Sequence, residues 1–265
     1  MTEFLSTTRG DAVAYDLRGA GPAVIFVAGA GPHRATDPIT TPTAVAAAER
    51  GLTTVVYDRL GRGESPAAGR IDLDRELAAI AALIERAGGG AVLCGHSSGC
   101  WISLAAAAAG LPVSGLVLWE APGSESGGSN ARWIAEVERR MDAGDLEGAL
   151  RHYMKDMPPE WFEGARHSPD FADTLSLVPS FRADGEAMVW QQSAPLPELL
   201  RGVRVPLEAV VGEQTFPEMP DVARALADAV PGGVHRVLPG ADHSWQPEPM
   251  AAELSRFVRN AKAAA

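Results

Sequence analysis

One serine in the chain has the surroundings of a catalytic nucleophile. Ser97 is the central residue of Gly95-His96-Ser97-Ser98-Gly99, which is a Gly-x-Ser-x-Gly pattern. Between a buried strand and a helix, this pattern predicts a sharp turn that exposes the serine, because the two glycines permit tight turning and close packing. A serine hydroxyl becomes a good nucleophile when a neighbouring base takes its proton. The predicted chemistry is therefore nucleophilic attack by a serine.

The base is expected among the six histidines, which are His33, His96, His152, His167, His235 and His243. His243 is the best placed, since it follows the last predicted strand in a turn that leads into the final helix. His96 lies inside the turn around Ser97 and is too constrained to serve its neighbour. His33 follows a glycine-rich loop, where it can either contact substrate or remain solvated. We therefore predict His243 as the general base.

Buried strands alternate with helices along most of the chain. Apolar runs predict strands at 23–27, 53–57, 91–94, 113–119, 207–211 and 234–238, and helical patterns lie at 43–50, 71–86, 101–109, 220–230 and 248–262. Residues 4–18 can add two short strands as an antiparallel edge. This order predicts an α/β fold, with a mostly parallel sheet of about eight strands and helices on both faces. Ser97 would then lie at the carboxyl edge of the sheet, where such proteins bind ligands.

The alternation stops at residues 123–201, which lack a buried-strand pattern. A Gly/Ser-rich linker at 124–130 is followed by amphipathic helical patterns at 131–143 and 146–157. We predict a helical cap at 123–201 and a core formed by 1–122 and 202–265. Most aromatic residues of the cap are expected to hold the cap itself together. The candidates for substrate contact are His33, Trp133, Trp161, Met188 and Trp190.

Four segments, in order, give the chain a resemblance to the α/β-hydrolase family over nearly its whole length. They are the loop 29–31, the segment 58–65, the turn 95–99 and the turn 240–243. The resemblance implies an α/β-hydrolase fold and hydrolysis through an acyl-enzyme. It also implies an oxyanion hole formed by the backbone N–H of Ser98 and that of Gly29 or Ala30. Residues 58–65 are expected to form a structural turn without a catalytic role.

The catalytic acid departs from the common family pattern. The usual aspartate position, after the strand 207–211, holds Thr215. Glu120 follows the strand 113–119, and its surroundings Trp-Glu-Ala-Pro resemble those of haloalkane dehalogenases and zearalenone-type lactonases that take their acid from this strand end. Glu213, which is close to the usual position, is the alternative. The predicted triad consists of Ser97, Glu120 and His243.

The triad and the cap lead us to expect an esterase or lactonase that acts on a small, largely apolar substrate. A carbon–carbon bond hydrolase with the same triad is one alternative. A ligand-binding or sensor protein that retains a hydrolase pocket is another. A dehalogenase is disfavoured, because that chemistry needs a carboxylate at the position of Ser97.

The composition argues against several other classes of protein. The chain has 265 residues, of which 23 are basic and 34 acidic, so its net charge is −11. This charge disfavours nucleic acid and anionic lipid as partners. The two cysteines, Cys94 and Cys100, are expected to be reduced packing residues, and no metal or cofactor is expected. Without a signal-peptide pattern or a membrane-spanning run, we expect a cytoplasmic monomer or homodimer whose partner is a small-molecule substrate.

Overall fold

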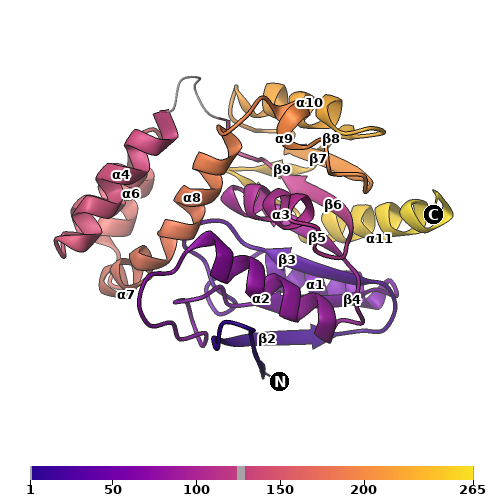
Figure 1. The fold of residues 1–265 in the computed structure, drawn as a ribbon, viewed down its shortest axis with the longest axis horizontal. Coiled ribbons are helices and arrows are strands. Elements are labelled where there is room, and N and C mark those ends of the chain that lie inside the picture. The colour runs from indigo at the N-terminus through magenta and orange to yellow at the C-terminus, as the bar shows by residue number, and fades with distance from the viewer. Residues whose placement is uncertain (1, 124–128, 265) are drawn as a thin grey trace.

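A central sheet of eight strands organises the molecule (Figure 1). The computed structural model describes residues 2–123 and 129–264. The strands are β1 (Glu3–Ser6), β2 (Ala12–Arg18), β3 (Ala23–Val27), β4 (Thr53–Tyr57), β5 (Ala91–His96), β6 (Val113–Trp119), β7 (Leu207–Gly212) and β8 (Val234–Leu238). Their spatial order is β1-β2-β4-β3-β5-β6-β7-β8. Strands β1 and β2 pair antiparallel, and the pairs from β4 to β8 are parallel. The predicted mostly parallel sheet with an antiparallel edge is confirmed.

Both faces of the sheet are covered by helices. Successive side chains of a strand point to opposite faces, so an apolar run has to be covered on both. The long helices of the sheet are α1 (Thr40–Glu49), α2 (Leu73–Arg86), α3 (Ser98–Ala108), α10 (Met219–Ala229) and α11 (Pro247–Ala264). On one face, Val24 and Phe26 of β3 pack with apolar residues of α1 and α11. On the other face, Ile25 and Val27 pack with those of α2, α3 and α10. The central strands are thus buried on both sides, as their continuous apolar runs predict.

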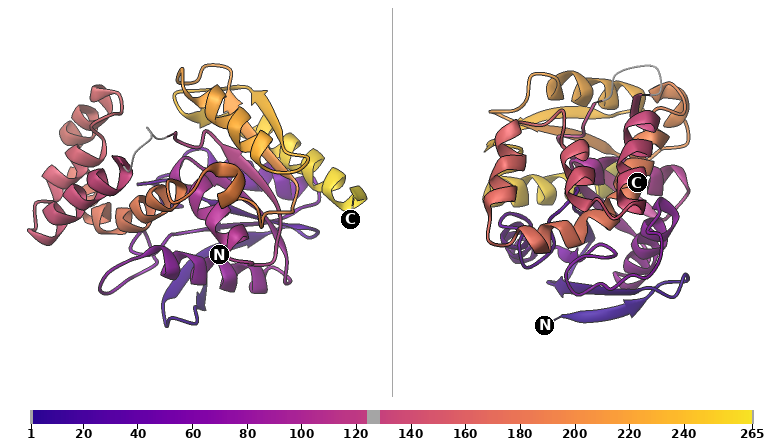
Figure 2. Two further views of the ribbon diagram at one scale, coloured as in Figure 1. Left: turned by 45° about the horizontal axis from the view of Figure 1, so that its top comes forward. Right: turned by 90° about the vertical axis from the view of Figure 1, so that its left-hand side faces the viewer.

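The segment between β6 and β7 is helical throughout its regular structure. It contains α4 (Ser129–Asp142), α5 (Leu146–Tyr153), α6 (Pro159–His167), α7 (Phe171–Leu177), α8 (Phe181–Gln191) and α9 (Leu196–Leu199). Helices α4, α6 and α7 lie at the end of the molecule opposite to the C-terminus (Figures 1 and 2). The predicted linker at 124–130 lies outside the described residues, except for Ser129 and Asn130, which begin α4.

Two apolar clusters divide this helical segment. Residues of α4 to α6 such as Val137, Leu150 and Phe162 form a cluster of their own. In contrast, Ala183 and Ala187 of α8 belong to the main core, where α8 packs against α3. Helix α8 therefore connects the outer helices to the elements that carry Ser97.

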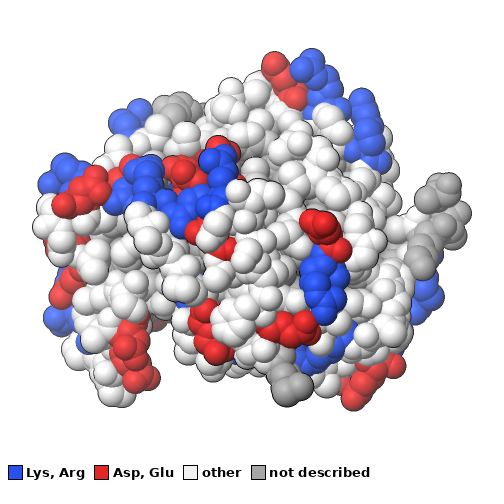
Figure 3. Space-filling model, turned by 60° about the horizontal axis from the view of Figure 1, so that its bottom comes forward, with Lys and Arg blue, Asp and Glu red and all other residues white. Residues whose placement is uncertain are grey.

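Acidic and basic side chains lie side by side on the surface. On the face shown in Figure 3, groups of blue and red side chains adjoin one another. Partly exposed ion pairs of the molecule include those of Arg139 and Arg140 with Glu136. Pairs of this kind contribute about 0–1 kcal/mol each to stability. In the described part of the chain, no helix has the length and apolar character needed to cross a membrane.

Candidate active site

Ser97 occupies a strained turn between β5 and α3. Its φ is 54° and its ψ is −129°, a conformation that L-residues rarely adopt. The residues two positions before and two positions after Ser97 have to be glycines. A Cβ on Gly99 would lie 2.2 Å from the carbonyl oxygen of Val27, and a Cβ on Gly95 would lie 2.7 Å from Cα of Cys100. The N–H of Ser97 donates to the carbonyl of Trp119 at 2.9 Å. The turn predicted from the glycine spacing therefore also ties Ser97 to the end of β6.

Strained backbone gathers around the predicted triad. Among the residues that the structure describes, the non-glycine residues with positive φ are Ser97, Glu120, Asp242 and His243. A residue held in such a region costs about 1–3 kcal/mol and persists where its surroundings fix it. Three of these four residues are the predicted triad. Such strain concentrates at functional sites, which makes this edge of the sheet the candidate active site.

His243 is presented by a tight hairpin between two short strands. Residue Ala241 of β9 (Gly240–Ala241) pairs with Ser244 of β10 (Ser244–Trp245), so that Asp242 and His243 form a two-residue loop. Their φ values are 51° and 63°. Positive φ at both positions is the mark of a type I′ turn, which normally favours Asn and Gly. A histidine there needs contacts from outside the hairpin to hold it.

Glu120 provides the first of these contacts. Nδ1 of His243 donates to Oε2 of Glu120 at 2.6 Å, and the N–H of Gly212 donates to Oε1 at 2.9 Å. The glutamate is only 1% exposed, and burial raises its pKa, but the hydrogen bonds from His243 and Gly212 outweigh burial and bring the pKa below its ordinary value. Glu120 is therefore ionised at neutral pH. Since Nδ1 of His243 holds the donated proton, Nε2 is the basic nitrogen of the neutral ring.

The alternative acid lies elsewhere. The side chain of Glu213 is exposed, and the backbone N–H of this residue donates to the carbonyl of Leu238. Thr215, at the usual acid position, lies near enough to Glu120 to help lower its pKa. Of the two acids considered from the sequence, the structure brings Glu120 to His243.

His96 provides the second contact to the hairpin. Its Nε2 lies 2.8 Å from the carbonyl oxygen of His243, and its ring packs against the rings of His243 and Trp245. Because a carbonyl accepts, Nε2 of His96 carries a proton. Burial, followed by the nearby His243, lowers the pKa of His96 to about 4. His96 is thus a neutral donor that supports the turn of His243.

The loop after β3 passes directly over Ser97. A Cβ on Gly29 would lie 2.8 Å from Cβ of Ser97, so only glycine permits this approach. The carbonyl of Gly29 accepts a hydrogen bond from Nη1 of Arg62 at 2.5 Å. In a trans peptide the following N–H, that of Ala30, points the opposite way. The N–H of Ser98 is a first-turn donor of α3, which has no partner within its helix.

A fully buried group of four charges stands behind this loop. Arg59, Arg62, Glu76 and Asp184 have side chains that are 0% exposed. Arg59 and Arg62 approach Asp184 at 2.6 and 2.8 Å, and Arg59 approaches Glu76 at 3.3 Å. Burial raises the pKa of Asp184, but the two arginines outweigh it, and the pKa lies below its ordinary value. Neither the arginines nor Asp184 are among the predicted site residues.

A cavity of about 270 Å³ opens beside His243. Its lining includes Trp161 of α6, Thr215 and Phe216. The ring centroids of Trp161 and Phe216 lie 6.2 and 6.0 Å from that of His243. Trp161 is a predicted substrate contact, whereas Phe216 is not. Phe216 lies in the loop after β7, where no sequence pattern indicates that it would line a cavity.

The other predicted contacts lie in different surroundings. Nε1 of Trp133 donates to the carbonyl of His152, and its ring packs on Tyr153. Met188 is buried in the main core, and Trp190 packs against the same core. The structure does not place these three along the cavity beside His243, and their contact with substrate stays a prediction.

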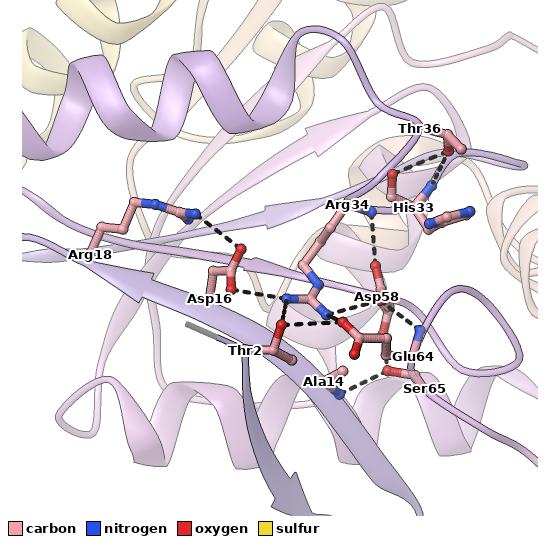
Figure 4. Close-up of polar contacts among 10 residues, drawn as sticks. All are labelled: Thr2, Ala14, Asp16, Arg18, His33, Arg34, Thr36, Asp58, Glu64 and Ser65. Atoms are coloured by element: carbon pink, nitrogen blue, oxygen red, sulfur yellow. Dashed lines mark hydrogen bonds and ion pairs between the residues drawn. The ribbon is translucent and has the colours of Figure 1, made fainter.

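His33 lines a separate cavity of about 350 Å³. There Arg34 pairs with Asp16 and Asp58 at 3.0 and 3.1 Å and also reaches Glu64, while the ring of His33 points away from these pairs (Figure 4). Asp58 also accepts the N–H of Glu64 at 2.9 Å. The contacts of Asp58 hold the turn at 58–65 together. A role of His33 toward substrate stays a prediction.

The cysteines and the acidic residues form no further centre in the described residues. Cys94 and Cys100 are both free and buried, and burial raises the pKa of each thiol. Within residues 2–123 and 129–264, no group of three or more His, Cys, Asp or Glu side chains is arranged to hold a metal ion.

Comparison with known proteins finds one family that matches most of the chain. Residues 2–255 match the alpha/beta hydrolase family. The chain is similar to an alpha/beta hydrolase from Sphaerobacter thermophilus DSM 20745, with 26% identity, a TM-score of 0.83, and coverage of 97% of this chain and 100% of that one. The predicted α/β-hydrolase fold is confirmed.

Two further solved structures share the fold at lower identity. The enol-lactonase from Burkholderia xenovorans LB400 is 17% identical, with a TM-score of 0.67 over 98% of this chain and 100% of that one. A thermophilic esterase from Thermogutta terrifontis is 20% identical, with a TM-score of 0.65 over 98% and 97% of the two chains. No curated protein is similar enough to the chain to count as a match.

Proposed function

The chain belongs to the alpha/beta hydrolase family, and from this premise we propose that it is a serine hydrolase that cleaves a carboxylic ester or lactone through an acyl-enzyme. The observation that carries the proposal is the hydrogen bond between His243 and the buried Glu120, at the sheet edge where Ser97 holds its strained turn. An esterase and an enol-lactonase among the structures of similar fold support this reaction class.

The proposed reaction gives each residue of the triad a separate role. The hydroxyl oxygen of Ser97 attacks the acyl carbon while Nε2 of His243 takes the hydroxyl proton, and the carbonyl oxygen becomes an oxyanion. The C–O bond to the alcohol then breaks, and His243 returns the proton to the departing oxygen. In the second half, His243 takes a proton from water, the hydroxide attacks the acyl-enzyme, and the acid product leaves as Ser97 regains its proton.

Glu120 and the loop donors stabilise the charges that develop. The carboxylate of Glu120 holds His243 in the required tautomer and stabilises the imidazolium. The N–H groups of Ser98 and Ala30 bind the oxyanion, and each such donor supplies about 3 kcal/mol of transition-state stabilisation. The acid lies at the end of the strand that follows the nucleophile helix, and this position resembles that of the acid in zearalenone-type lactonases.

The cavity beside His243 indicates the kind of substrate. Its volume of about 270 Å³ and the rings of Trp161 and Phe216 suit a small substrate with a flat or apolar part. The rest of the lining is largely polar, with Glu160, Gln214, Thr215 and Asp242, and polar groups of this kind fix the orientation of a bound ligand. We assign residues 123–201 the role of a cap over this cavity, to whose lining they contribute Pro158, Glu160 and Trp161.

A serine-directed probe tests the proposed function. Ser97→Ala is expected to lower kcat for an activated aryl ester by about 10⁶-fold, because removing a nucleophilic serine has that effect elsewhere. The variant should also lose labelling by a fluorophosphonate. Ser193→Ala, which alters an exposed serine of the helical segment, should keep both properties. Labelling that survives in Ser97→Ala contradicts the nucleophile, and a wild-type protein with neither labelling nor turnover contradicts the function.

A further inference from the structure

One carboxylate connects the two predicted donors of the oxyanion hole. Oδ1 of Asp184 accepts a hydrogen bond from the hydroxyl of Ser98 at 2.7 Å and one from Nη1 of Arg59 at 2.6 Å. Oδ2 accepts from Nη2 of Arg62 at 2.8 Å. Asp184 comes from α8, whereas Ser98 begins α3. A single side chain thus joins the outer helical segment to the residue that follows Ser97.

The arginines extend this connection to the loop over Ser97. Nη1 of Arg62 donates to the carbonyl of Gly29, and Nη1 of Arg59 donates to the carbonyls of Ala28 and Gly29 at 3.1 and 3.3 Å. With its carbonyl fixed on this side, the Gly29–Ala30 peptide has its N–H fixed on the other. A cationic donor at the carbonyl also polarises the peptide, which makes the Ala30 N–H a stronger donor.

We propose that Asp184 is a positioning residue of the oxyanion hole, acting directly on Ser98 and through Arg62 on Ala30. The inference rests on the proposed acyl-transfer function. Neither donor depends on Asp184 for its existence, since both are backbone N–H groups. What Asp184 fixes is their direction before substrate arrives. Preorganised donors stabilise a developing oxyanion without reorganising during the reaction, and this is the source of their large effect.

The chemistry of the cluster favours this role over simple stabilisation of the fold. Burying charges is expensive, and buried ion pairs can often be replaced by apolar residues without loss of stability. Two arginines and two acids are nevertheless fully enclosed here, directly behind Gly29 and Ser98. Apolar side chains could fill the same space, but they could not hold the Gly29 carbonyl or the Ser98 hydroxyl.

The test compares Asp184→Asn with a matched variant at the other end of the sheet. Glu208 is also a buried carboxylate between two arginines, Arg236 and Arg256, but it lies near the start of β7. Both substitutions keep the size of the side chain and remove one charge. We expect Asp184→Asn to lower kcat for an activated ester by about 10- to 100-fold with KM within about threefold, since loss of a whole donor lowers kcat by about 10²–10³-fold. Glu208→Gln should leave kcat within about threefold.

A transition-state analogue separates positioning from stability. Affinity for an alkyl boronic acid, which forms a tetrahedral adduct with the serine, should fall in Asp184→Asn by the same factor as kcat/KM, whereas affinity for a carboxylic acid product should hold. The measurements are made well below the melting temperature of each variant. Equal behaviour of Asp184→Asn and Glu208→Gln in kcat and boronate affinity overturns the inference.

A second variant covers the case in which Asp184→Asn does not fold. Ser98→Ala removes the hydrogen bond to Asp184 and leaves all four buried charges in place. It should lower kcat and boronate affinity together by about 3- to 10-fold, the effect of one hydrogen bond of about 1 kcal/mol. Unchanged values in Ser98→Ala overturn the link to Ser98. A wild-type protein that hydrolyses no ester refutes the proposed function instead, so the two failures are distinct.

Discussion

The two sides of Ser97 hold their buried charges in different ways. On one side Glu120 pairs with His243, whose side chain remains 14% exposed. On the other side Asp184 pairs with Arg59 and Arg62, and all three side chains are 0% exposed. In the proposed reaction the first pair gains a positive charge during each turnover, whereas the second group keeps its charges throughout.

This difference suits the two tasks. A group that exchanges protons with substrate and water has to reach them, and the exposed edge of His243 at the cavity permits this. Groups that aim fixed dipoles gain from complete burial, because electrostatic interactions strengthen as water is excluded. The cluster also balances its charges, with Arg59 and Arg62 against Glu76 and Asp184, whereas Glu120 carries a charge that only the imidazolium neutralises. Of these two sides, activity should therefore be more sensitive at Glu120, and stability more sensitive in the arginine cluster.

Between the two sides of Ser97, the larger effect on activity is expected from Glu120→Gln. The amide cannot stabilise the imidazolium and favours the wrong tautomer of His243, so kcat for an activated ester should fall by about 10⁴-fold. Stability should change less, because the amide keeps the shape of the side chain and a partner for the N–H of Gly212. Steady-state kinetics and urea unfolding measure the two quantities.

Thr215 and Glu213 provide the controls for Glu120. Thr215→Ala removes a hydroxyl near the carboxylate and should lower kcat by less than about fivefold, because Glu120 keeps its hydrogen bonds to His243 and Gly212. Glu213→Gln alters an exposed side chain and should have no effect. A larger loss in either control than in Glu120→Gln would place the acid after β7 and remove the comparison between the two sides.

The largest effect on stability is expected from Arg59→Met. The substitution keeps much of the volume but leaves Glu76 and Asp184 without one of their cations, and breaking a buried pair in this way costs about 3–5 kcal/mol. Arg70→Met serves as the control, since Arg70 is 48% exposed and pairs with Glu138 and Glu186. Its loss should lower the free energy of unfolding by about 0–1 kcal/mol. Similar losses in the two variants, measured by urea unfolding, would show that enclosure adds nothing to these ion pairs.

The sequence indicates one side of Ser97 far better than the other. The turn around Ser97 can be predicted because glycines are needed at positions 95 and 99, where backbones approach closely. The strands can be predicted because apolar runs are buried on both faces of the sheet. Glu120 is accessible to prediction because it directly ends such a run. These signals are local: each depends on residues within a few positions of one another.

The side of Ser97 that holds Asp184 and the predicted oxyanion donors is formed by contacts between residues far apart in the sequence, which no local pattern contains. Arg59 and Arg62 lie in a loop, and charged loop residues are normally exposed. Their partner Asp184 is more than a hundred positions later in the chain. The positive φ of His243 is equally hidden, because it follows from the pairing of Ala241 with Ser244 and not from a glycine.

A smaller effect on stability than that of Arg59→Met is expected from the titration of His96, which lies between the two sides of Ser97. Its ring is held between the Gly29 loop and the His243 hairpin, and its pKa is lowered to about 4 by burial and by His243, against the opposing effect of Asp37 and Glu120. The unfolded chain binds this proton below about pH 6.5 and the folded protein only below about pH 4. The unfolded state therefore holds more protons in this window, so stability falls as the pH decreases from 6.5 to 4 and levels off below.

This loss should reach about 3 kcal/mol at pH 4, because each tenfold change in proton affinity corresponds to about 1.4 kcal/mol. Urea unfolding of the wild type and His96→Gln between pH 7 and pH 4 measures it. The glutamine can still donate to the His243 carbonyl but cannot titrate, so the variant should lose less stability over this range. His167→Gln, which alters a histidine whose side chain is 69% exposed, should follow the wild type. If His96→Gln also follows the wild type, the acid sensitivity arises from other groups. The contact between the Gly29 loop and the His243 hairpin then does not depend on a neutral His96.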